Sequence, residues 1–232
     1  MTVRYSDAQL QQQRDLPGAG VRRQAVDPQH IEWIQRLCSR SDAAEGEIRA
    51  LISGDFGPED PLGQRLAKWL TATLTECLGE FQYRRWSLQA NRDPWHPHAD
   101  QSWHETLVPK YTVLIPLTAG PRTCVFHQRV LDAEPWGRPQ ESKDLYQVNT
   151  PPQASPGYEG HSPGHAFTVE HHTQHYAHTD YAWFEGLTVD MEYQWQVGDI
   201  IWWPSVAIHC SDDHTAQGIP VKHSVIVGTW FV

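Results

Sequence analysis

The chain has 232 residues, the size of one ordinary domain, and can bury a sizeable hydrophobic core without disulfide or metal staples. Hydrophobic residues make up 39% and charged residues 20% of it, a composition typical of a packed globule and not of a disordered tail. The formal net charge of -10 at pH 7 repels phosphate backbones, and no stripe of Lys and Arg offsets it. We therefore expect no nucleic-acid partner.

Membrane and secreted proteins are disfavoured by the hydrophobic pattern. No run approaches the roughly 18 apolar residues that span a bilayer, and the N-terminal segment lacks the apolar centre of a signal peptide. The expectation is no membrane partner and a cytoplasmic location. The four cysteines (Cys38, Cys77, Cys124 and Cys210) lie far apart without a CxxC pair, which predicts reduced and mostly structural thiols.

The beginning of the chain differs in texture from the rest. Residues 1–26 are polar and interrupted by Pro17, Gly18 and Gly20, which predicts an arm or lid outside the core. Residues 27–232 are expected to form a single domain that carries any catalytic site.

Two helices are predicted in residues 27–80, as a buttress for the rest of the domain. Asp27 and Pro28 supply an N-cap and a first helical position for a run of apolar residues at helical spacing. A second helix is predicted from Pro61 to Leu78, where apolar side chains share one face and Gly79 follows as a stop.

Residues 81–232 form short β-type runs separated by turn-rich segments. No clear helix-length periodic stretch lies between the runs, which favours antiparallel pairing over parallel βαβ units. We expect a mainly β, jelly-roll fold with the N-terminal helices packed on the outside. The segment from about 129 to 190 is expected to be an insertion in this β core, because its first part is rich in Pro, Gly, Ser and charge. The predicted strands are Tyr83–Ala90, Tyr111–Thr118, Thr123–His127, Phe167–Glu170, Ile200–Trp203 and Val221–Phe231.

The sharpest local signal is the pair His98 and Asp100. They are two residues apart, so in an extended strand both side chains point to the same face. His209 is the candidate for a third ligand, since it follows a short turn after the apolar run Ile200–Trp203. Two histidines and one carboxylate on one side of a metal leave other positions open, an arrangement that suits Fe(II) binding a bidentate acid and O2.

The His98-x-Asp100 pair, the distal His209, and Lys222 followed by Ser224 resemble the Fe(II)/2-oxoglutarate-dependent oxygenases over most of the strand-rich part of the chain. The resemblance implies a double-stranded β-helix, which is the cupin-like form of the jelly-roll. It also implies that His98, Asp100 and His209 are catalytic metal ligands for Fe(II), with 2-oxoglutarate and O2 as co-substrates.

Lys222 stands where this family commonly has Arg in an Arg-x-Ser pattern. The resemblance implies that it pairs with the distal carboxylate of 2-oxoglutarate, while Ser224 adds a hydroxyl donor. Tyr111 or Thr112 is expected to reach the co-substrate as well. Related halogenases replace the metal-binding carboxylate with Gly or Ala. The presence of Asp100 therefore favours hydroxylation, or a desaturation or cyclisation that starts with the same hydrogen abstraction.

Trp103 and Arg122 are the candidates for contact with the substrate, because both lie in sequence near the predicted metal and insertion segments. A small polar molecule, such as an amino acid or a natural-product intermediate, is the expected substrate. The oligomeric state has no sequence signal.

Other histidines compete for a role at a metal. His96 and Asp100 are four residues apart and would converge only on a helix, which the neighbouring prolines oppose. His214 follows Asp212 and Asp213 in what reads as a solvated loop, so a surface histidine is expected there.

A histidine-rich segment suggests a second metal site as an alternative. His171, His175 and His178 would share one face of a helix. No cysteine accompanies them, and the nearby acids have no evident ligand spacing, so a polar flap beside the active site is the favoured interpretation.

Two other functions stay open. A cupin-like metalloenzyme or dioxygenase would use the same triad without 2-oxoglutarate, and Lys222 would then be an ordinary strand residue. A noncatalytic β-sandwich binding module would carry the histidines incidentally. Metal content and turnover of 2-oxoglutarate separate these alternatives.

Overall fold

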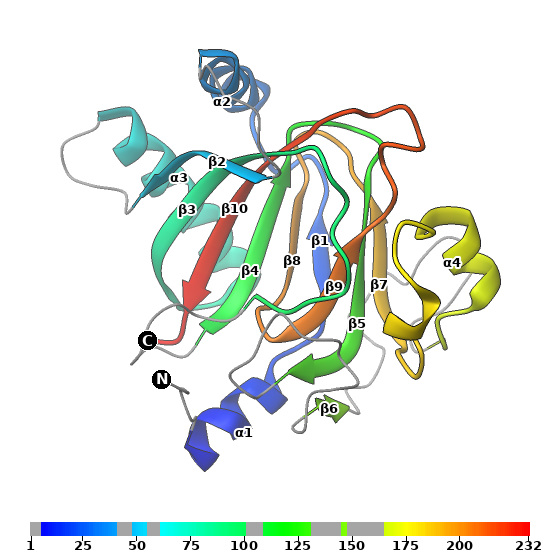
Figure 1. Cartoon of the computed structure of the whole chain (residues 1–232). Helices are drawn as coiled ribbons and strands as arrows, with labels where there is room; N and C mark the ends of the chain where they lie inside the picture. The colour runs from blue at the N-terminus through cyan, green and yellow to red at the C-terminus, as the bar shows by residue number, and fades with distance from the viewer. Residues whose placement is uncertain (1–5, 41–47, 55–60, 101–108, 131–144, 148–164) are drawn as a thin grey trace.

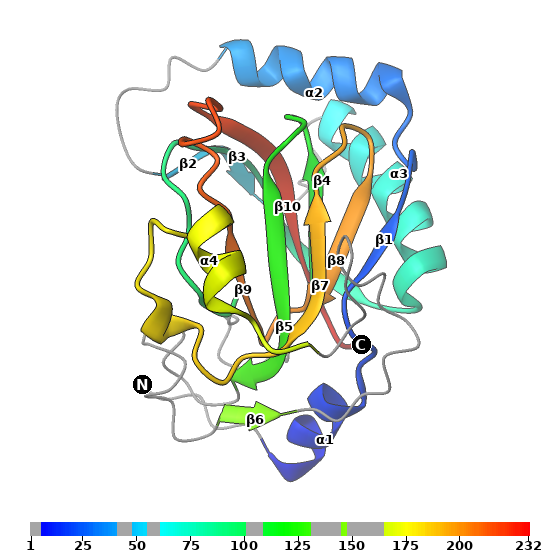
Figure 2. The same ribbon diagram turned by 90° about the vertical axis from the view of Figure 1, so that its right-hand side faces the viewer.

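A computed structural model of the chain describes residues 6–40, 48–54, 61–100, 109–130, 145–147 and 165–232. Two antiparallel β-sheets face each other, and helices lie outside the larger sheet (Figure 1, Figure 2). The side chains between the sheets form one buried cluster, to which Leu114 and Ile201 contribute from the larger sheet and Val125 and Met191 from the smaller. The β core is therefore a two-layered sandwich.

The larger sheet has six strands in the order β1-β8-β4-β10-β3-β2, and every pair is antiparallel. The bounds are β1 (Gly20–Arg22), β8 (Ile200–Pro204), β4 (Pro109–Pro116), β10 (Lys222–Trp230), β3 (Gln82–Asn91) and β2 (Ile48–Gly54). In the smaller sheet one central strand pairs with β6 and β7 and, on its other side, with β9. These strands are β5 (Arg122–Val130), β6 (Leu145–Gln147), β7 (Val189–Gln194) and β9 (Ala207–Ser211).

The chain winds back and forth between the two sheets. β3 and β4 belong to the larger sheet, and between them His98 forms an isolated bridge with His209 of β9, in the smaller sheet. After β5 and β7 of the smaller sheet, β8, β9 and β10 lie in the larger, smaller and larger sheet in turn. This winding is a double-stranded β-helix, so the predicted mainly β fold is confirmed.

The two predicted helices are confirmed, and both pack on the outer face of the larger sheet (Figure 2). They are α2 (Pro28–Arg40) and α3 (Pro61–Leu78). The Asp27 carboxylate accepts a hydrogen bond from the Gln29 backbone N–H at 2.8 Å, as an N-cap does. Gly79, with a φ of 69°, ends α3 in the left-handed conformation that favours glycine.

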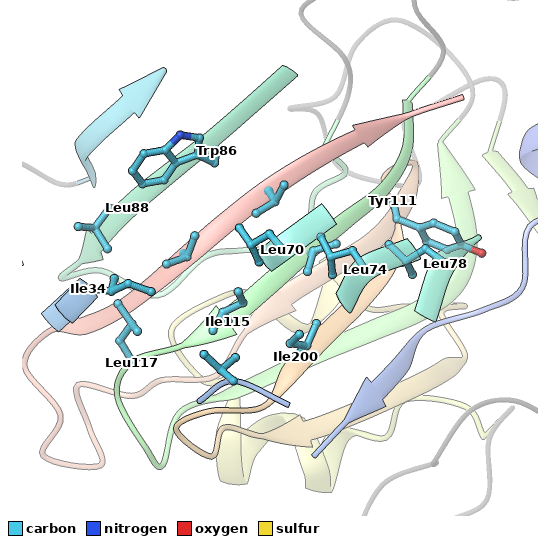
Figure 3. Packing of buried hydrophobic residues seen from close by; sticks show 14 of the residues in the cluster. Ile34, Leu70, Leu74, Leu78, Trp86, Leu88, Tyr111, Ile115, Leu117 and Ile200 are labelled. Carbon is cyan, nitrogen blue, oxygen red and sulfur yellow. The ribbon is translucent and has the colours of Figure 1, made fainter. Parts of the chain in front are cut away.

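One face of α3 carries the contact with the sheet. Leu70, Leu74 and Leu78 are four residues apart and lie on the side of the helix that is turned to the strands (Figure 3). They belong to a buried apolar cluster with Trp86 and Leu88 of β3. Burying one such leucine contributes about 1.5–3 kcal/mol, so this layer is a main source of the stability of the fold.

Residues 6–26, the described part of the N-terminal segment, belong to the folded core, which corrects the expectation of an arm or lid. After α1 (Asp7–Asp15), β1 adds an edge strand to the larger sheet by pairing with β8. Leu16 and Val26 are buried in the same apolar cluster as α3. The polar composition of the segment concealed these few anchoring side chains.

Gly18 and Gly20 permit close contacts and do not merely interrupt the chain. A Cβ at Gly18 would lie 2.6 Å from the Asp190 carboxylate, and one at Gly20 would lie 2.4 Å from the Trp202 indole. The Arg129 guanidinium donates hydrogen bonds to backbone carbonyl groups in α1 and just after it. The segment is thus held against both sheets, since Asp190 and Arg129 belong to the smaller one and Trp202 to the larger.

The strand predicted at Phe167–Glu170 is wrong. The Thr168 hydroxyl accepts a hydrogen bond from the His171 backbone N–H at 3.2 Å and so begins α4 (Val169–His175). Sequence reasoning also missed α1, β1, β2, β6, β7 and β9. In β7 the buried acids Asp190 and Glu192 interrupt the apolar run, which hides the strand.

Part of the insertion expected at residues 129–190 covers the outer face of the smaller sheet. Residues 131–144 and 148–164 lie outside the described part. Residues 165–187 contain α4 and a 3-10 turn, and α4 lies beside the smaller sheet (Figure 1). The aromatic side chains of this segment pack against Phe126 of β5. This segment therefore completes a second apolar layer.

Within the described residues, no helix is both long and apolar enough to cross a membrane. Cys77, Cys124 and Cys210 are free thiols, and the last two are buried, as expected for structural cysteines. The side chain of Cys38 lies outside the described part of the chain.

Candidate metal centre

Backbone pairing brings the two candidate histidines together. The His98 N–H donates to the His209 carbonyl at 3.0 Å, and the His209 N–H donates to the His98 carbonyl at 2.8 Å. Two residues beyond this bridge along β9, the Ser211 hydroxyl accepts a hydrogen bond from the Trp95 N–H at 2.7 Å, which extends the pairing. The segment that contains Trp95 and His98 is therefore hydrogen-bonded to β9. This pairing brings residues that are far apart in sequence into one site.

The side chains of His98, Asp100 and His209 converge from these two strands. One ligand atom from each lies within 4.8 Å of the other two. Asp100 sits between the histidines, with Oδ1 3.9 Å from His98 Nε2 and Oδ2 3.3 Å from His209 Nε2. Among the described residues this is the one group of His, Cys, Asp and Glu close enough to hold a metal.

Hydrogen bonds set the tautomer of both rings. His98 Nδ1 lies 2.7 Å from the His96 carbonyl, and His209 Nδ1 lies 3.1 Å from the Ala207 carbonyl. A carbonyl oxygen only accepts, so each Nδ1 carries the proton and each Nε2 presents a lone pair toward Asp100. This is the orientation that a metal-binding histidine needs.

Burial keeps the His98 ring neutral. Desolvation, reinforced by the neighbouring His209, lowers the pKa of His98 to about 3, although Asp100 opposes the shift. The Asp100 side chain is 36% exposed, whereas those of His98 and His209 are at most 8% exposed. Two imidazoles and one accessible carboxylate form a donor set that fits Fe(II) and leaves coordination positions open.

The triad opens into a cavity of about 240 Å³ between the two sheets. Its walls contain polar groups at separate places and apolar side chains between them. The lining residues are Gln89, Asn91, Trp95, His98, Asp100, Leu114, Thr123, Trp195, Trp203, His209, Cys210, Ser211, Lys222, Ser224 and Ile226. Five of the residues expected at the site (His98, Asp100, His209, Lys222 and Ser224) therefore meet in one cavity.

Lys222 is a buried cation in the wall of this cavity. It is only 2% exposed, and burial lowers its pKa to about 8, although the nearby Asp212 opposes the shift. No described carboxylate forms an ion pair with its ammonium group, which lies 5.3 Å from the centre of the Trp195 ring. The Ser224 hydroxyl, fully buried beside it on β10, has no hydrogen-bond partner among the described residues. The buried Lys222 amine and the Ser224 hydroxyl together form a candidate binding site for an anion.

Tyr111 and Thr112 do not contact the cavity. Adjacent residues of a strand point to opposite faces, and the Tyr111 ring lies on the helix side of the larger sheet (Figure 3). Thr112 points inward, where its hydroxyl donates to Ser205 at 3.2 Å, but it does not line the cavity. The structure therefore does not place Tyr111 or Thr112 at the cavity, and contact of either residue with the co-substrate stays a prediction.

The two residues expected to contact the substrate gain no support. Arg122 lies at the start of β5 and is not among the described residues that line the cavity. Trp103 lies outside the described residues. Both assignments stay predictions.

Two competing histidines have other roles. His96 is not part of the triad, and its ring packs 4.8 Å from that of Trp183. His214 is fully buried, which corrects the expected surface position. The error arose because its acidic neighbours suggested solvent, whereas the Asp212 carboxylate accepts a hydrogen bond from Gln217 inside the fold at 2.7 Å.

Two histidines of the histidine-rich segment hold α4 in position through side-chain hydrogen bonds. His171 Nε2 lies 3.0 Å from the buried Glu192 carboxylate, and His172 Nε2 lies 2.6 Å from the Thr179 carbonyl. Within the described residues, His171, His175 and His178 do not belong to a group of ligands close enough to hold a metal. The interpretation of this segment as a polar flap stays a prediction.

Sequence reasoning missed several lining residues. Gln89 and Asn91 lie opposite Ser224 and Lys222 in the β3–β10 pairing, and Trp195 and Trp203 close the wall. Gln89 and Asn91 are two positions apart, and this spacing in a strand indicates that they share a face. Only the register shows that this face meets Lys222.

No family model and no curated protein matches the sequence. Solved structures do match the fold. An oxidoreductase of the 2OG-Fe(II) oxygenase family from Burkholderia pseudomallei is 13% identical, with a TM-score of 0.51, over 96% of this chain and 88% of its own. HygX from Streptomyces hygroscopicus, with nickel and 2-oxoglutarate bound, is 13% identical, with a TM-score of 0.51, over 98% and 88%.

A third similar structure is that of SnoK, a non-heme alpha ketoglutarate dependent carbocyclase from nogalamycin biosynthesis. It is 12% identical, with a TM-score of 0.52, over 98% of this chain and 84% of its own. Nearly the whole chain is covered in each case. The chain therefore has the double-stranded β-helix fold of the 2-oxoglutarate- and iron-dependent oxygenases.

Proposed function

We propose that the protein is an Fe(II)- and 2-oxoglutarate-dependent oxygenase. The observation that carries the proposal is that His98, Asp100 and His209 open into the same cavity as Lys222, a buried cation without a described carboxylate partner. A metal triad alone fits many enzymes. A triad that faces such an ammonium group, with the Ser224 hydroxyl beside it, fits an acid that binds the metal at one end and has a carboxylate at the other.

The proposed reaction consumes 2-oxoglutarate, O2 and a substrate C–H bond, and forms succinate, CO2 and the hydroxylated product. Fe(II), when bound, supplies the activation of O2. His98 and His209 offer Nε2 and Asp100 a carboxylate oxygen to the metal. Lys222 and Ser224 bind the remote carboxylate, and the apolar walls exclude water from the reacting end.

The size of the cavity supports this division of labour. Its volume of about 240 Å³ is small for a pocket that encloses a whole drug-sized ligand, for which about 300–1,000 Å³ is usual. It suits the co-substrate. The primary substrate then meets the metal from the side of Asp100, the most exposed member of the triad.

We infer that the substrate is a small polar molecule, with a natural-product intermediate as the leading class. HygX has been solved with hygromycin B bound, and SnoK belongs to nogalamycin biosynthesis, so the same fold serves such chemistry elsewhere. Hydroxylation is the favoured outcome because Asp100 is present. SnoK is a carbocyclase, so cyclisation from the same hydrogen abstraction is the alternative to test.

The test measures metal and 2-oxoglutarate separately. Calorimetry with Mn(II), a redox-inert substitute for Fe(II), should show one metal per chain and binding of 2-oxoglutarate only when the metal is present. With Fe(II) and O2, slow succinate formation should occur without substrate, and metabolites that accelerate it identify the substrate class.

Each other result has a definite meaning. Metal binding without any binding or turnover of 2-oxoglutarate would indicate a cupin-like metalloenzyme, and Lys222→Ala would then spare activity. Absence of stoichiometric metal would indicate a noncatalytic binding module.

A further inference from the structure

Trp203 occupies an unusual position beside the metal triad. It lies on β8 with its side chain directed between the sheets, lines the cavity, and is only 2% exposed. Its ring centre is 4.7 Å from that of the ligand candidate His209. The indole is thus part of the wall at the metal end of the cavity.

The indole N–H of Trp203 has no acceptor among the described residues, although it is fully buried. Buried indole N–H groups normally find a partner, because a donor without one loses its hydrogen bonds to water. Trp195, in the same cavity, follows this rule: its indole N–H donates to the Thr123 hydroxyl at 2.9 Å. The exception at Trp203 therefore calls for an acceptor that enters the cavity.

The free donors of the cavity lie at two levels of the larger sheet. Trp203 lies opposite Thr112 of β4, whereas Ser224 lies opposite Pro116 of the same strand. Four residues of strand offset the two backbone positions by about 13 Å along β4, and the two strand spacings between β8 and β10 add about 9–10 Å across the sheet, a separation that two inward-leaning side chains shorten. The apolar Leu114 lies between the two levels. This order of donor, apolar wall and donor matches a linear acid with an acceptor group at each end.

We propose that Trp203 is a positioning residue whose indole N–H donates a hydrogen bond to the carboxylate at the metal end of bound 2-oxoglutarate. The inference rests on the proposed function. Lys222 and Ser224 bind the remote carboxylate, and Trp203 fixes the rotation of the acid at the metal. A neutral donor suits this end, because a cation there would oppose binding of the metal ion.

The decisive variant is Trp203→Phe, which keeps an aromatic ring against His209 and removes only the indole N–H donor and part of the ring. With Mn(II) bound, its Kd for 2-oxoglutarate should rise about tenfold or more, as expected for a lost hydrogen bond to a charged group. Its Kd for Mn(II) alone should stay within about twofold, because the donor does not touch the metal. Trp202→Phe is the matched control: it alters the neighbouring residue, which packs on the helix side of the sheet, and should leave both constants unchanged.

The outcomes separate this inference from the proposed function. If the unaltered protein binds no 2-oxoglutarate with Mn(II), the proposed function fails. If it does bind 2-oxoglutarate and Trp203→Phe binds equally well, the role of Trp203 alone is overturned. An equal loss of Mn(II) binding in Trp203→Phe would assign Trp203 to packing of His209 and also overturn the inference.

A second measurement on the unaltered protein covers the case in which Trp203→Phe does not fold. The chain has 11 tryptophans, whose indole N–H signals are observable by NMR after 15N labelling of tryptophan. Addition of 2-oxoglutarate to the Zn(II)-loaded protein should move one signal downfield and slow its exchange with solvent. If no indole signal responds in this way, the proposed hydrogen bond does not form.

Discussion

The two faces of β10 are equally buried but differ in character. On the helix side, Val225 and Val227 are at most 1% exposed and pack in an apolar cluster. On the cavity side, Lys222 and Ser224 are at most 2% exposed, yet Ser224 has no described hydrogen-bond partner and Lys222 no described ion pair. Burial alone therefore does not distinguish stabilising from binding residues. The distinction lies in whether the buried groups already have partners.

The largest effect on the cavity side is expected from the triad. His209→Ala should weaken metal binding by more than about a hundredfold, since even residues behind the ligands commonly cost ten- to a hundredfold. Calorimetry with Mn(II) measures it. His96→Asn is the matched control, because His96 is near the triad but outside it. Equal losses in both variants would contradict the assignment of His209.

Removal of the Lys222 ammonium group should have the second-largest effect on ligand binding. Lys222→Ala should raise the Kd for 2-oxoglutarate by roughly thirtyfold or more, because truncating one partner of a buried charge pair typically costs about 2–5 kcal/mol. Binding of Mn(II) should not change. Lys110→Met, on the same sheet but hydrogen-bonded to carbonyl groups outside the cavity, should leave 2-oxoglutarate binding intact.

The helix side predicts the opposite pattern. Leu74 is fully buried between α3 and the sheet, so Leu74→Ala should lower the free energy of unfolding by about 2–5 kcal/mol. Urea denaturation measures this loss. At a temperature where the variant stays folded, its Kd for 2-oxoglutarate should equal that of the unaltered protein. A tenfold change in that Kd would show that the two faces are coupled.

The buried amine also predicts a pH dependence. Because burial lowers the pKa of Lys222 to about 8, the side chain is charged below that pH and loses its charge as the pH rises through it. The affinity for 2-oxoglutarate should therefore fall above pH 8, by up to about tenfold per pH unit. Lys222→Arg, whose side chain stays charged, should abolish this fall. Asp212 raises the pKa of the same amine and so opposes this loss of charge, whereas His178 and His214, whose pKa values burial lowers below 6.5, are uncharged in this pH range.

The smallest effect is expected at Ser224. Its hydroxyl is a neutral donor, so Ser224→Ala should weaken 2-oxoglutarate binding by only about two- to tenfold, in line with about 0.5–1.5 kcal/mol per hydrogen bond. The variant should also be as stable as the unaltered protein or slightly more stable without ligand, because a buried group lacking a described partner has been removed. A clear loss of stability would mean that the hydroxyl has a partner in the free protein.

Local patterns were enough to predict much of this molecule. The two helices could be predicted from the spacing of apolar residues and from capping residues at their ends. His98 and Asp100 share a face because they are two residues apart in an extended segment. Lys222 and Ser224 follow from the same alternation. These inferences needed no knowledge of which strands are neighbours.

The errors arose where tertiary structure decides. β4 is buried on both faces, so its sequence gives no sign that Tyr111 faces the helices and Thr112 the interior. Asn91 meets Lys222 only through the register of β3 against β10. His214 looked solvent-exposed because of its acidic neighbours, but the fold buries it. Partners distant in sequence settle each of these positions.

The backbone pairing of His98 with His209 joins the segment that follows β3 to β9, the penultimate strand of the chain. A metal held by both side chains would act as a clasp across this long loop of chain, and its binding energy would add to the stability of the folded state. At a free metal concentration of about a hundred times the Kd, the gain is about 2.7 kcal/mol. Metal supply would then govern how long the protein survives as well as whether it is active.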